Sequence, residues 1–483
     1  MATPTMNTVP LTPFSTAGMS HDLQAMLYGA KWGQALGTGV ELTYSFPQAG
    51  AAHASSYGDG ANEWGSLVGL NVAERAGVRL ALGAWAHSAD VTFTESADTP
   101  TVVGELRYGI SSAVGSSYAY SYFPSTDPAA GDTWFSNQWN RNAAHGLKPG
   151  TFAFYATLHE IGHDLGLKHP FQGDARLDRA HNDLFYTVMS YHAKPGSSAT
   201  ANFYPTTPMY LDLLAAQEMY GQSKTANTGD TKYIFHENQH YWETINDASG
   251  IDTFVYRSSH ASLIDLRQDH FSHLGEAIKF SDHSSSLNTV NIGPGVVIEN
   301  AQGGSGDDQI IGNSARNTLL GGAGNDNISG GNGVDTISGG GGNDIVYGGN
   351  GKDVLNGGSG LDKFVYHNVA ESTSAQFDTV TNFNFQEDRF ALDVKVNKID
   401  PAISSGALSS GAGFDAQLHA AVSTAHLHAG DAVLFTPSKG SFAGDTFLII
   451  DANGKAGYQA GQDFVIRLDH AIHVASISTH DFS

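Results

Sequence analysis

Three histidines and one glutamate lie within eleven residues, at a spacing suited to metal-assisted hydrolysis. His159 and His163 are four residues apart, so on a helix their rings leave one face a single turn apart. Glu160 is offset around that helix, where its carboxylate can take a proton from metal-bound water. Gly166 can end the helix in a tight conformation and return the chain, bringing His169 as a third ligand. Three protein ligands and a water would form a catalytic zinc site.

The alternative is a helix that exposes several histidines to solvent. A lone His-x-x-x-His would leave that alternative open. The full spacing, with the glutamate and the glycine, arises by chance in roughly one chain of this length in 10⁴, if each of the five residues has a frequency of about one in twenty. The sequence therefore predicts one catalytic Zn²⁺ on His159, His163 and His169.

This stretch resembles the metzincin signature, and a second segment fits the same pattern. Thr187-Val188-Met189-Ser190-Tyr191 follows the third histidine, with Met189 twenty residues past His169. In that family a tight turn places a methionine beneath the metal, and the tyrosine two residues later can act as an extra ligand. The resemblance implies these roles for Met189 and Tyr191. Taken alone, Met-Ser-Tyr would be an ordinary core and turn segment.

Tyr191 and the repeats described below indicate a resemblance to the serralysin branch, which implies a secreted zinc endopeptidase. In such an enzyme Glu160 takes the proton of the attacking zinc-bound water and passes it to the leaving amine. Tyr191 moves off the metal and donates a hydrogen bond to the oxyanion. A calcium-dependent adhesion module is a competing class, which the zinc signature disfavours. A repeat-bearing lipase would need a Gly-x-Ser-x-Gly elbow, and the sequence has none.

The segments around these residues predict a twisted sheet with two long helices. Strands are expected from apolar alternation at residues 40–46, 90–95, 105–110 and 119–124. A helix at 71–87 would bury the small-residue face Ala73, Ala76, Leu80 and Ala84. The zinc helix begins at about Thr151, and a helix over 205–220, with Thr207 as N-cap, closes the domain.

The strand that contains Ala119, Tyr120 and Ser121 has a specific role in the resembling family. There it is the sheet edge above the cleft, where substrate adds as an extended strand through main-chain hydrogen bonds. The resemblance therefore implies that these three residues bind substrate. The alternative is an interior strand.

Composition narrows the possible partners and chemistry. The 483 residues carry a net charge of −24, which argues against nucleic acid and anionic membranes and favours divalent cations. With no cysteine, disulfides and thiolate chemistry are excluded. The chain has no Sec-type signal peptide at its start and no apolar stretch long enough to span a membrane. Its length predicts two to four domains.

A nine-residue phrase, Gly-Gly-x-Gly-x-Asp-x-apolar-x, recurs seven times without a gap over residues 303–365. It resembles the repeat of calcium-binding β-rolls, in which two repeats make one coil. Glycines allow tight turns, and the sixth residue supplies a hard anionic oxygen. The eighth positions form a narrow apolar core: Ile310, Leu319, Ile328, Ile337, Val346, Leu355 and Phe364. The alternative is a disordered Gly/Asn linker, which seven phased apolar positions disfavour when calcium is present.

Several structural Ca²⁺ ions are expected between stacked repeats. One edge would carry Asp308, Asp326, Asp344 and Asp362, and the other Asp335 and Asp353 with Asn317, which lacks the acidic group. The resemblance implies further ligands upstream, each of which could instead be an ordinary turn residue: Asn227, Gly229, Thr231, Asp247, Ser249, Gly250, Asp252 and Glu299. Residues 366–483 are expected to be mixed β-structure. Asp451 to Asp463 faintly resembles a calcium loop, but Lys455 favours a hairpin turn instead.

The predicted fold is an α+β zinc-protease domain, a twisted sheet plus long helices, followed by an all-β domain with a parallel β-roll. The expected divisions are a tail or short prosegment at 1–25, the protease domain at 26–225, and the roll with a secretion domain at 226–483. The resemblance implies a secreted, extracellular monomer exported by a type I secretion apparatus through an uncleaved C-terminal signal. Protein and peptide substrates and a small periplasmic protein inhibitor are the expected partners. The final residues, Asp481-Phe482-Ser483, depart from the family's usual ending.

Overall fold

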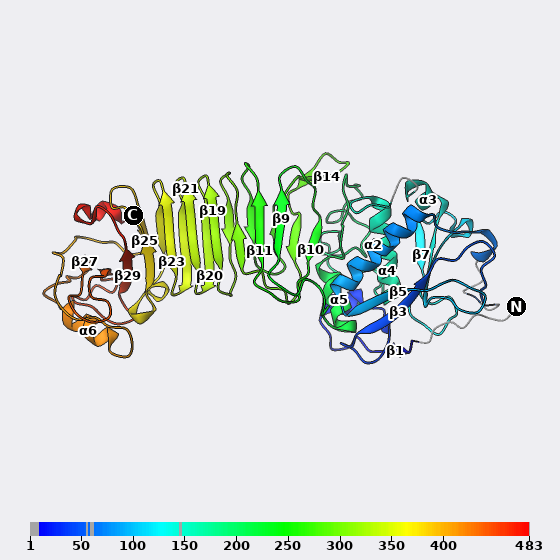
Figure 1. The fold of residues 1–483 in the computed structure, drawn as a ribbon, viewed down its shortest axis with the longest axis horizontal. Helices are drawn as coiled ribbons and strands as arrows, with labels where there is room; N and C mark the ends of the chain where they lie inside the picture. Colours follow the sequence, from blue (N-terminus) through cyan, green and yellow to red (C-terminus); the bar gives the residue numbers. More distant parts are fainter. Residues whose placement is uncertain (1–8, 55–56, 58–61, 144–146, 483) are drawn as a thin grey trace. The chain divides into compact units, whose positions relative to one another are not determined.

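The computed structural model describes residues 9–54, 57, 62–143 and 147–482 (Figure 1). The chain forms two compact units. The first contains the described residues up to Gly229 together with 238–250 and 275–296, and the second contains 230–237, 251–274 and the chain from Val297 onward. The sequence predicted one boundary, between residues 225 and 226, whereas the units alternate along the chain between residues 229 and 297.

The first unit has a mixed sheet with the strand order β5-β3-β6-β8-β7. Strands β3, β5, β6 and β8 are parallel, β7 runs antiparallel to β8, and the short β4 pairs with β6. The four strands predicted here are present, although the last ends at Ser121 and not at residue 124. β7 is an edge strand, as predicted. The bounds are β3 Val40–Ser45, β4 Leu67–Val68, β5 Val91–Glu95, β6 Leu106–Ser111, β7 Ala119–Ser121 and β8 Asp132–Phe135.

Two long helices, α2 (Val72–Ser88) and α4 (Phe152–Leu165), pack against each other beside the sheet (Figure 1). The predicted helix over 71–87 is correct, but its predicted buried face is wrong. Ala73, Ala76 and Leu80 are exposed, and α2 instead buries the face that contains Gly77 and Trp85. The reason is tertiary: a Cβ on Gly77 would collide with Leu147, and the Trp85 indole N–H donates to the Leu158 carbonyl at 3.0 Å.

The helix expected over 205–220 is shorter than predicted. α5 spans Tyr210–Tyr220, with Met209 as N-cap and Gly221 after its end. Thr207 does not cap it, because its hydroxyl accepts a hydrogen bond from the Thr244 N–H instead. The remaining elements of the first unit are α1 His21–Met26, α3 Asn137–Ala143, β1 Leu11–Pro13, β2 Ala30–Trp32, β10 Glu243–Ile245, β14 Ile278–Lys279, β15 Ser285–Ser286 and β16 Val290–Ile292.

Part of the segment predicted as a tail is folded. Residues 1–8 lie outside the described part of the chain, but β1 pairs antiparallel with β2, Leu11 opposite Trp32. The helix α1 buries Ala25 and Met26. The amide of Lys168 donates to the Met26 carbonyl at 2.8 Å. This segment therefore supports the loop that follows the zinc helix.

The second unit is dominated by a β-roll made of two parallel sheets, seen as stacked arrows in Figure 1. Within the repeats, successive strands alternate between the sheets, and residues 18 positions apart pair, for example Leu319 with Ile337 and Ile328 with Val346. Two repeats therefore make one coil, as predicted. The strands are β9 Lys232–His236, β11 Thr253–Arg257, β12 Leu263–Asp265, β17 Asn300–Gln302, β18 Gln309–Ile311, β19 Thr318–Ala323, β20 Asn327–Gly333, β21 Thr336–Gly341, β22 Ile345–Gly351, β23 Val354–Ser359, β24 Lys363–Tyr366, β25 Asp378–Thr381 and β26 Arg389–Leu392. The short strand β13, Phe271–Ser272, lies outside both sheets.

The core of the roll is two columns of apolar side chains, one from each sheet. All seven eighth-position residues of the repeats are at most 1% exposed. The stack continues past the repeats, because Phe364 pairs with Phe390 and Leu355 with Val380. Burial of this kind contributes roughly 25 cal/mol per Å² of apolar surface. The apolar columns therefore favour the stacked state, whatever the turns bind.

After the roll, the chain forms an antiparallel extension of the ten-stranded sheet and one helix that the sequence analysis did not predict. The antiparallel pairing of β28 with β29 makes the segment around Asp451 a hairpin connection, as predicted. The bounds are α6 Phe414–Ala421, β27 Ala432–Phe435, β28 Thr446–Ile450 and β29 Phe464–Asp469. Among the described residues, no helix has the length and apolar character needed to cross a bilayer.

Candidate active site and carboxylate ladders

The helix α4 has well-defined ends that fix the position of its histidines. Thr151 is the N-cap, and its hydroxyl accepts a hydrogen bond from the Phe154 N–H. Gly166 follows the last turn in a left-handed conformation, with φ of 105°. A Cβ at that position would lie 2.5 Å from the Ala30 carbonyl oxygen, so only glycine fits there. The helix end predicted from the sequence is confirmed, and the chain turns back toward the helix beyond it.

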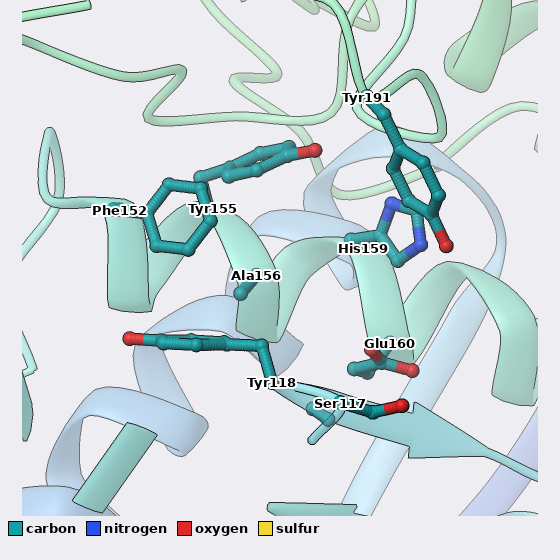
Figure 2. A pocket seen from close by; sticks show the side chains of 9 residues that line it. Ser117, Tyr118, Phe152, Tyr155, Ala156, His159, Glu160 and Tyr191 are labelled. Atoms are coloured by element: carbon teal, nitrogen blue, oxygen red, sulfur yellow. The ribbon is translucent and has the colours of Figure 1, made fainter. Parts of the chain in front are cut away.

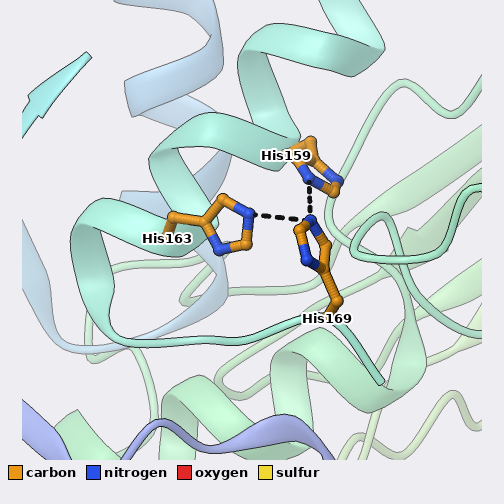
Figure 3. A group of neighbouring side chains, drawn as sticks. All are labelled: His159, His163 and His169. Carbon is orange, nitrogen blue, oxygen red and sulfur yellow. Dashed lines mark hydrogen bonds between the residues drawn. The ribbon is translucent and has the colours of Figure 1, made fainter. Parts of the chain in front are cut away.

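His159, His163 and His169 converge through their Nε2 atoms (Figure 3). His169 Nε2 lies 3.1 Å from His159 Nε2 and 3.1 Å from His163 Nε2. Ligand nitrogens at bonds of about 2.0–2.1 Å around a tetrahedral ion would be roughly 3.3 Å apart. The structure therefore brings the three predicted ligands together at a separation that suits one zinc ion.

The hydrogen bonds of Nδ1 fix the tautomers of His159 and His163, and so decide whether their Nε2 atoms can bind a metal. His159 Nδ1 lies 2.8 Å from the Val188 carbonyl, and His163 Nδ1 lies 2.8 Å from the Leu167 carbonyl. A carbonyl can only accept, so each Nδ1 carries the proton and each Nε2 presents a lone pair. Burial, together with the His169 ring, lowers the pKa of His159 to about 3, which keeps this ring neutral. No carbonyl of the described residues fixes the tautomer of His169, but its Nε2 faces the other two, so the three nitrogens fit a single metal ion.

Met189 packs against α4 at Gly162, between the two helical histidines. It is fully buried, and a Cβ on Gly162 would lie 2.5 Å from its sulfur. The glycine between the two helical histidines therefore admits the methionine. Asp212 of α5 holds this turn: its carboxylate accepts from the Thr187 hydroxyl at 2.6 Å and the Val188 N–H at 2.7 Å. The sequence analysis did not identify Asp212. Its position, an acidic residue in the first turn of a helix, was the feature that could have identified it.

Glu160 lines a pocket of about 240 Å³ beside the histidines (Figure 2). The pocket is walled by aromatic rings of Tyr118, Phe152 and Tyr155, with Tyr191 at its rim. Burial raises the pKa of Glu160 to about 8, an effect that the Ser121 hydroxyl opposes. The pocket thus places a sheltered carboxylate and an apolar cavity next to the candidate metal.

Two hydroxyls and a second buried carboxylate lie behind Ser121. Ser121 Oγ is 2.6 Å from Thr133 Oγ1, and Thr133 donates to Asp164 at 2.9 Å. Tyr108 also donates to Asp164, at 3.1 Å. These bonds connect three strands of the sheet to α4, so they fix the edge strand relative to the helix.

Tyr191 lies close to the three histidines but remains accessible. Its hydroxyl is 2.8 Å from His169 Nε2, and the residue is 62% exposed. The Phe171 ring stacks on His169 at a 5.0 Å centroid distance and tilts against Tyr191 at 5.1 Å. The hydroxyl can therefore reach the same point as the ring nitrogens, while its exposed ring has room to move.

The edge strand β7 places Ala119 on the pocket wall and pairs through Tyr120 and Ser121 with β8. Tyr120 also hydrogen-bonds the buried Glu63 carboxylate, as does Tyr122 at 2.8 Å. Among the described residues β7 pairs with β8 alone, so its outer edge is a candidate for receiving a further strand. Glu63 is a second supporting residue that the sequence analysis missed.

In the second unit, the sixth-position residues of the repeats form two ladders along the roll. In each ladder, the backbone N–H of one residue donates to the Oδ1 of the residue 18 positions on. Asp326 donates to Asp344 at 2.8 Å, and Asp335 donates to Asp353 at 2.8 Å. These are the two edges predicted from the sequence: Asp308, Asp326, Asp344 and Asp362 on one side, and Asn317, Asp335 and Asp353 on the other.

The second oxygens of these carboxylates are buried without a hydrogen-bond partner among the described residues. This holds for Oδ2 of Asp326, Asp335, Asp344, Asp353 and Asp362. Burial and neighbouring carboxylates raise the pKa of Asp326 to about 7, and burial raises that of Asp344 to about 6. Buried acceptors that lack a proton donor are suited to a hard divalent cation such as Ca²⁺.

The first residue of each ladder, Asp308 in one and Asn317 in the other, differs from the residues that follow it. Asp308 is satisfied by the protein, since it accepts from Ser262 and from the Gly304 N–H at 2.8 Å. Asn317 is satisfied as well, because it accepts from the Asn313 N–H and donates to the Glu299 carbonyl at 2.8 Å. These two positions therefore fit a cation less well than the five that follow.

Two carboxylates beyond the repeats continue the ladders. Asp378 Oδ1 accepts from the Asp353 N–H at 2.8 Å, and Asp388 Oδ1 accepts from the Asp362 N–H at 3.1 Å. The sequence analysis missed both as ladder residues, because they fall 25 and 26 residues on, outside the nine-residue period. The feature that could have identified them in the sequence is their position: Asp378 begins β25, and Asp388 directly precedes β26.

The upstream candidates divide between the two units. In the first, Asn227 and Gly229 flank Thr228, which bridges to Ser249 beside Gly250, and Asp247 accepts from the Ser249 N–H at 3.0 Å. In the second, the Asp252 carboxylate accepts from the Thr231 N–H, and the Asp252 N–H donates to Glu299, both at 2.8 Å. Within each unit, the structure brings its own candidates into neighbouring loops.

Comparison with known proteins connects these features. A family model described as Peptidase M10 serralysin C terminal matches residues 213–419. Serralysin from Proteus mirabilis is 31% identical over 348 residues, covering 64% of this chain and 67% of the relative. Metalloprotease AprA from Pseudomonas entomophila is 30% identical over 60% of this chain and 63% of its own length, and serralysin from Photorhabdus laumondii is 31% identical over 52% and 55%. The matches span about half to two thirds of these relatives.

A solved structure of the AlgE6R3 subunit of the Azotobacter vinelandii mannuronan C5-epimerase also matches 39% of this chain and 81% of its own. Its identity is 20% and its TM-score 0.16, so it supports no inference about fold. The Proteus mirabilis relative is matched over two thirds of its length, and the serralysin C-terminal model spans the repeats of the roll. On this evidence, the chain belongs to the serralysin family.

Proposed function

We propose that this chain is a secreted, calcium-stabilised zinc endopeptidase that hydrolyses peptide bonds in extracellular proteins. The observation that carries the proposal is the convergence of three histidine Nε2 atoms beside a sheltered carboxylate. His159, His163 and His169 would hold the zinc, with Tyr191 as an additional ligand. A zinc ion held there is a Lewis acid, which activates water and polarises a carbonyl oxygen.

The chain's own residues supply the proton transfers and the positioning. Glu160 accepts the proton of the attacking water and returns it to the leaving amine, a role that requires no movement of the helix. Tyr191, whose exposed side chain is free to turn, donates a hydrogen bond to the developing oxyanion. Met189 and Asp212 hold the turn beneath the ligands in place.

Substrate binding would use the edge strand and the aromatic pocket. An extended peptide adds beside β7 and pairs with main-chain groups of Ala119, Tyr120 and Ser121. The pocket walled by Tyr118 and Phe152 receives the side chain next to the scissile bond. Its aromatic walls suit a large apolar side chain.

The roll would bind several Ca²⁺ ions between successive coils. Residues with unpartnered oxygens are the first candidates, above all Asp326, Asp335, Asp344 and Asp353. We also propose that a type I apparatus exports the chain through an uncleaved C-terminal signal. Low cytosolic calcium would leave the roll loosely folded until it meets millimolar calcium outside.

Replacing the proposed general base tests the chemistry. Glu160→Ala should keep stoichiometric zinc and the wild-type circular dichroism spectrum, yet lose casein hydrolysis by about 10³-fold or more. His181→Gln replaces a histidine outside the site and should behave as wild type in both measurements. Near-normal proteolysis by Glu160→Ala would refute the mechanism.

A further inference from the structure

A second histidine–carboxylate cluster lies in the second unit, beyond the roll. One ligand atom each from Asp400, His428 and Asp431 lies within 4.8 Å of the other two. The two aspartates are buried, and the histidine is exposed at the protein surface. No residue of this cluster belongs to the ladders or to the active site described above.

The backbone around the cluster is held by hydrogen bonds that fix the three side chains relative to one another. The Asp400 N–H donates to the Ala432 carbonyl at 2.8 Å, and the Ala432 N–H donates to the Lys398 carbonyl at 3.0 Å. The Asp431 carbonyl accepts from the Asp451 N–H at 3.0 Å. Residues 397–400 and 428–432 therefore lie side by side, and the site is formed before any ligand arrives.

Asp400 already has cationic and N–H partners. Its Oδ2 accepts from the His428 backbone N–H at 2.8 Å and lies 2.9 Å from His428 Nδ1. Its Oδ1 pairs with Lys398 Nζ at 3.2 Å. The Lys398 side chain is 65% exposed, so it can move into solvent at little cost.

Asp431 has no such partner. The residue is only 6% exposed, and among the described residues no hydrogen bond reaches its carboxylate. Its oxygens do not occur among the fully buried atoms that lack a partner, so they reach solvent and are open to an incoming ion. Asp431 can therefore bind an ion without losing a protein hydrogen bond.

We propose that Asp400, His428 and Asp431 bind a divalent transition-metal ion, with zinc as the reference ion. Two carboxylate oxygens and an imidazole nitrogen are a ligand set of zinc-type ions, whereas calcium prefers oxygen ligands throughout. Binding through Nδ1 releases its proton to solvent, and Lys398 turns away from Asp400.

The bound ion connects two segments that the sequence separates by nearly thirty residues. Asp431 directly precedes β27, the terminal strand of the ten-stranded sheet. A metal at this point therefore anchors that end strand to residues 397–400. The expected consequence is a higher melting temperature for the part of the chain that follows the roll.

Zinc titration into the full chain tests this site. The protein is saturated with calcium and loaded with one equivalent of zinc, and further zinc is followed by isothermal titration calorimetry. We expect a second binding event in the wild type, weakened at least about tenfold in Asp431→Asn and in His428→Gln. His428 is exposed, so its variant keeps the test valid even if Asp431→Asn fails to fold.

His426→Gln is the matched control, because this histidine lies two residues away and is bonded only to Ser423. It should retain the second event unchanged. A wild type that binds only one zinc would overturn the proposal. So would a second event of equal strength in both site variants, which would mark binding to surface histidines elsewhere. Neither result would affect the separate proposal that His159, His163 and His169 hold the catalytic zinc.

Discussion

The two candidate metal-binding regions assemble their ligands in opposite ways. The histidine cluster uses ring nitrogens from one helix and the turn after it, and carbonyls of Val188 and Leu167 fix two of the rings. The ladders use carboxylates 18 residues apart, whose second oxygens have no partner. Neutral ligands can be arranged by protein contacts alone, but stacked carboxylates repel one another until a cation intervenes. The zinc site is therefore expected to persist without metal, and the roll to depend on calcium.

Removing each metal in turn gives the largest expected contrast. Three calcium ions, each at 100 times its Kd, together contribute about 8 kcal/mol, so chelation with EGTA should lower the melting temperature of the roll by roughly 20 °C. It should also reduce the β-sheet signal in circular dichroism. Removing zinc with phenanthroline should abolish proteolysis but leave that spectrum unchanged. Equal losses of structure after both treatments would contradict the expectation that only the roll depends on its metal for folding.

Within the ladders, a residue with an unpartnered oxygen should differ from one that the protein satisfies. Asp344→Ala removes a ligand shared by two candidate sites, and should raise the calcium concentration at the folding midpoint by about tenfold or more. Asn317→Ala removes hydrogen bonds to Asn313 and Glu299, so it should lower the melting temperature similarly with and without calcium. Calcium titrations followed by circular dichroism distinguish the two. Identical midpoints for both variants would contradict this assignment.

The smallest expected effect is a reversal of pH dependence when calcium is removed. Burial raises the folded-state pKa of Asp335 to about 7 and of Asp353 to about 6. The calcium-free folded state therefore binds more protons than the unfolded chain, and its stability falls as pH rises from about 4 to about 7. With calcium, ionised carboxylates are required, so stability should instead fall on acidification.

Melting temperatures at pH 5 and pH 8, in EGTA and in calcium, measure both slopes. Replacing Asp335 and Asp353 together with asparagine removes two of the titrating groups, and should flatten the calcium-free slope. A calcium-free protein that is more stable at pH 8 than at pH 5 would contradict the raised pKa values of these buried carboxylates.

Local features of the sequence were enough for several elements of the fold. The zinc helix was predictable because Thr151 and Gly166 act through backbone conformation at its two ends. The coils of the roll were predictable because a nine-residue period places every Ile310-type position on the same face. The helix is encoded within a few neighbouring residues, and the roll is encoded by a short pattern that recurs along the chain.

Contacts between distant segments could not be predicted in this way. The buried face of α2 depends on Leu147 and on the α4 backbone, so apolar spacing alone selected the wrong face. Asp212 and Glu63 support the site through partners 24 to 59 residues away. An isolated acidic residue looks the same in sequence whether it is buried or solvated.

The sequence by itself was enough to predict which three histidines would come together and how the roll would coil, because both follow from short-range spacing. Only the tertiary structure decided which oxygens are left without partners. Asp308 and Asp344 occupy the same position of the repeat, yet Ser262 satisfies one while the other has an unpartnered Oδ2. That difference depends on which backbone groups the folded chain brings beside each carboxylate, and no local pattern encodes it.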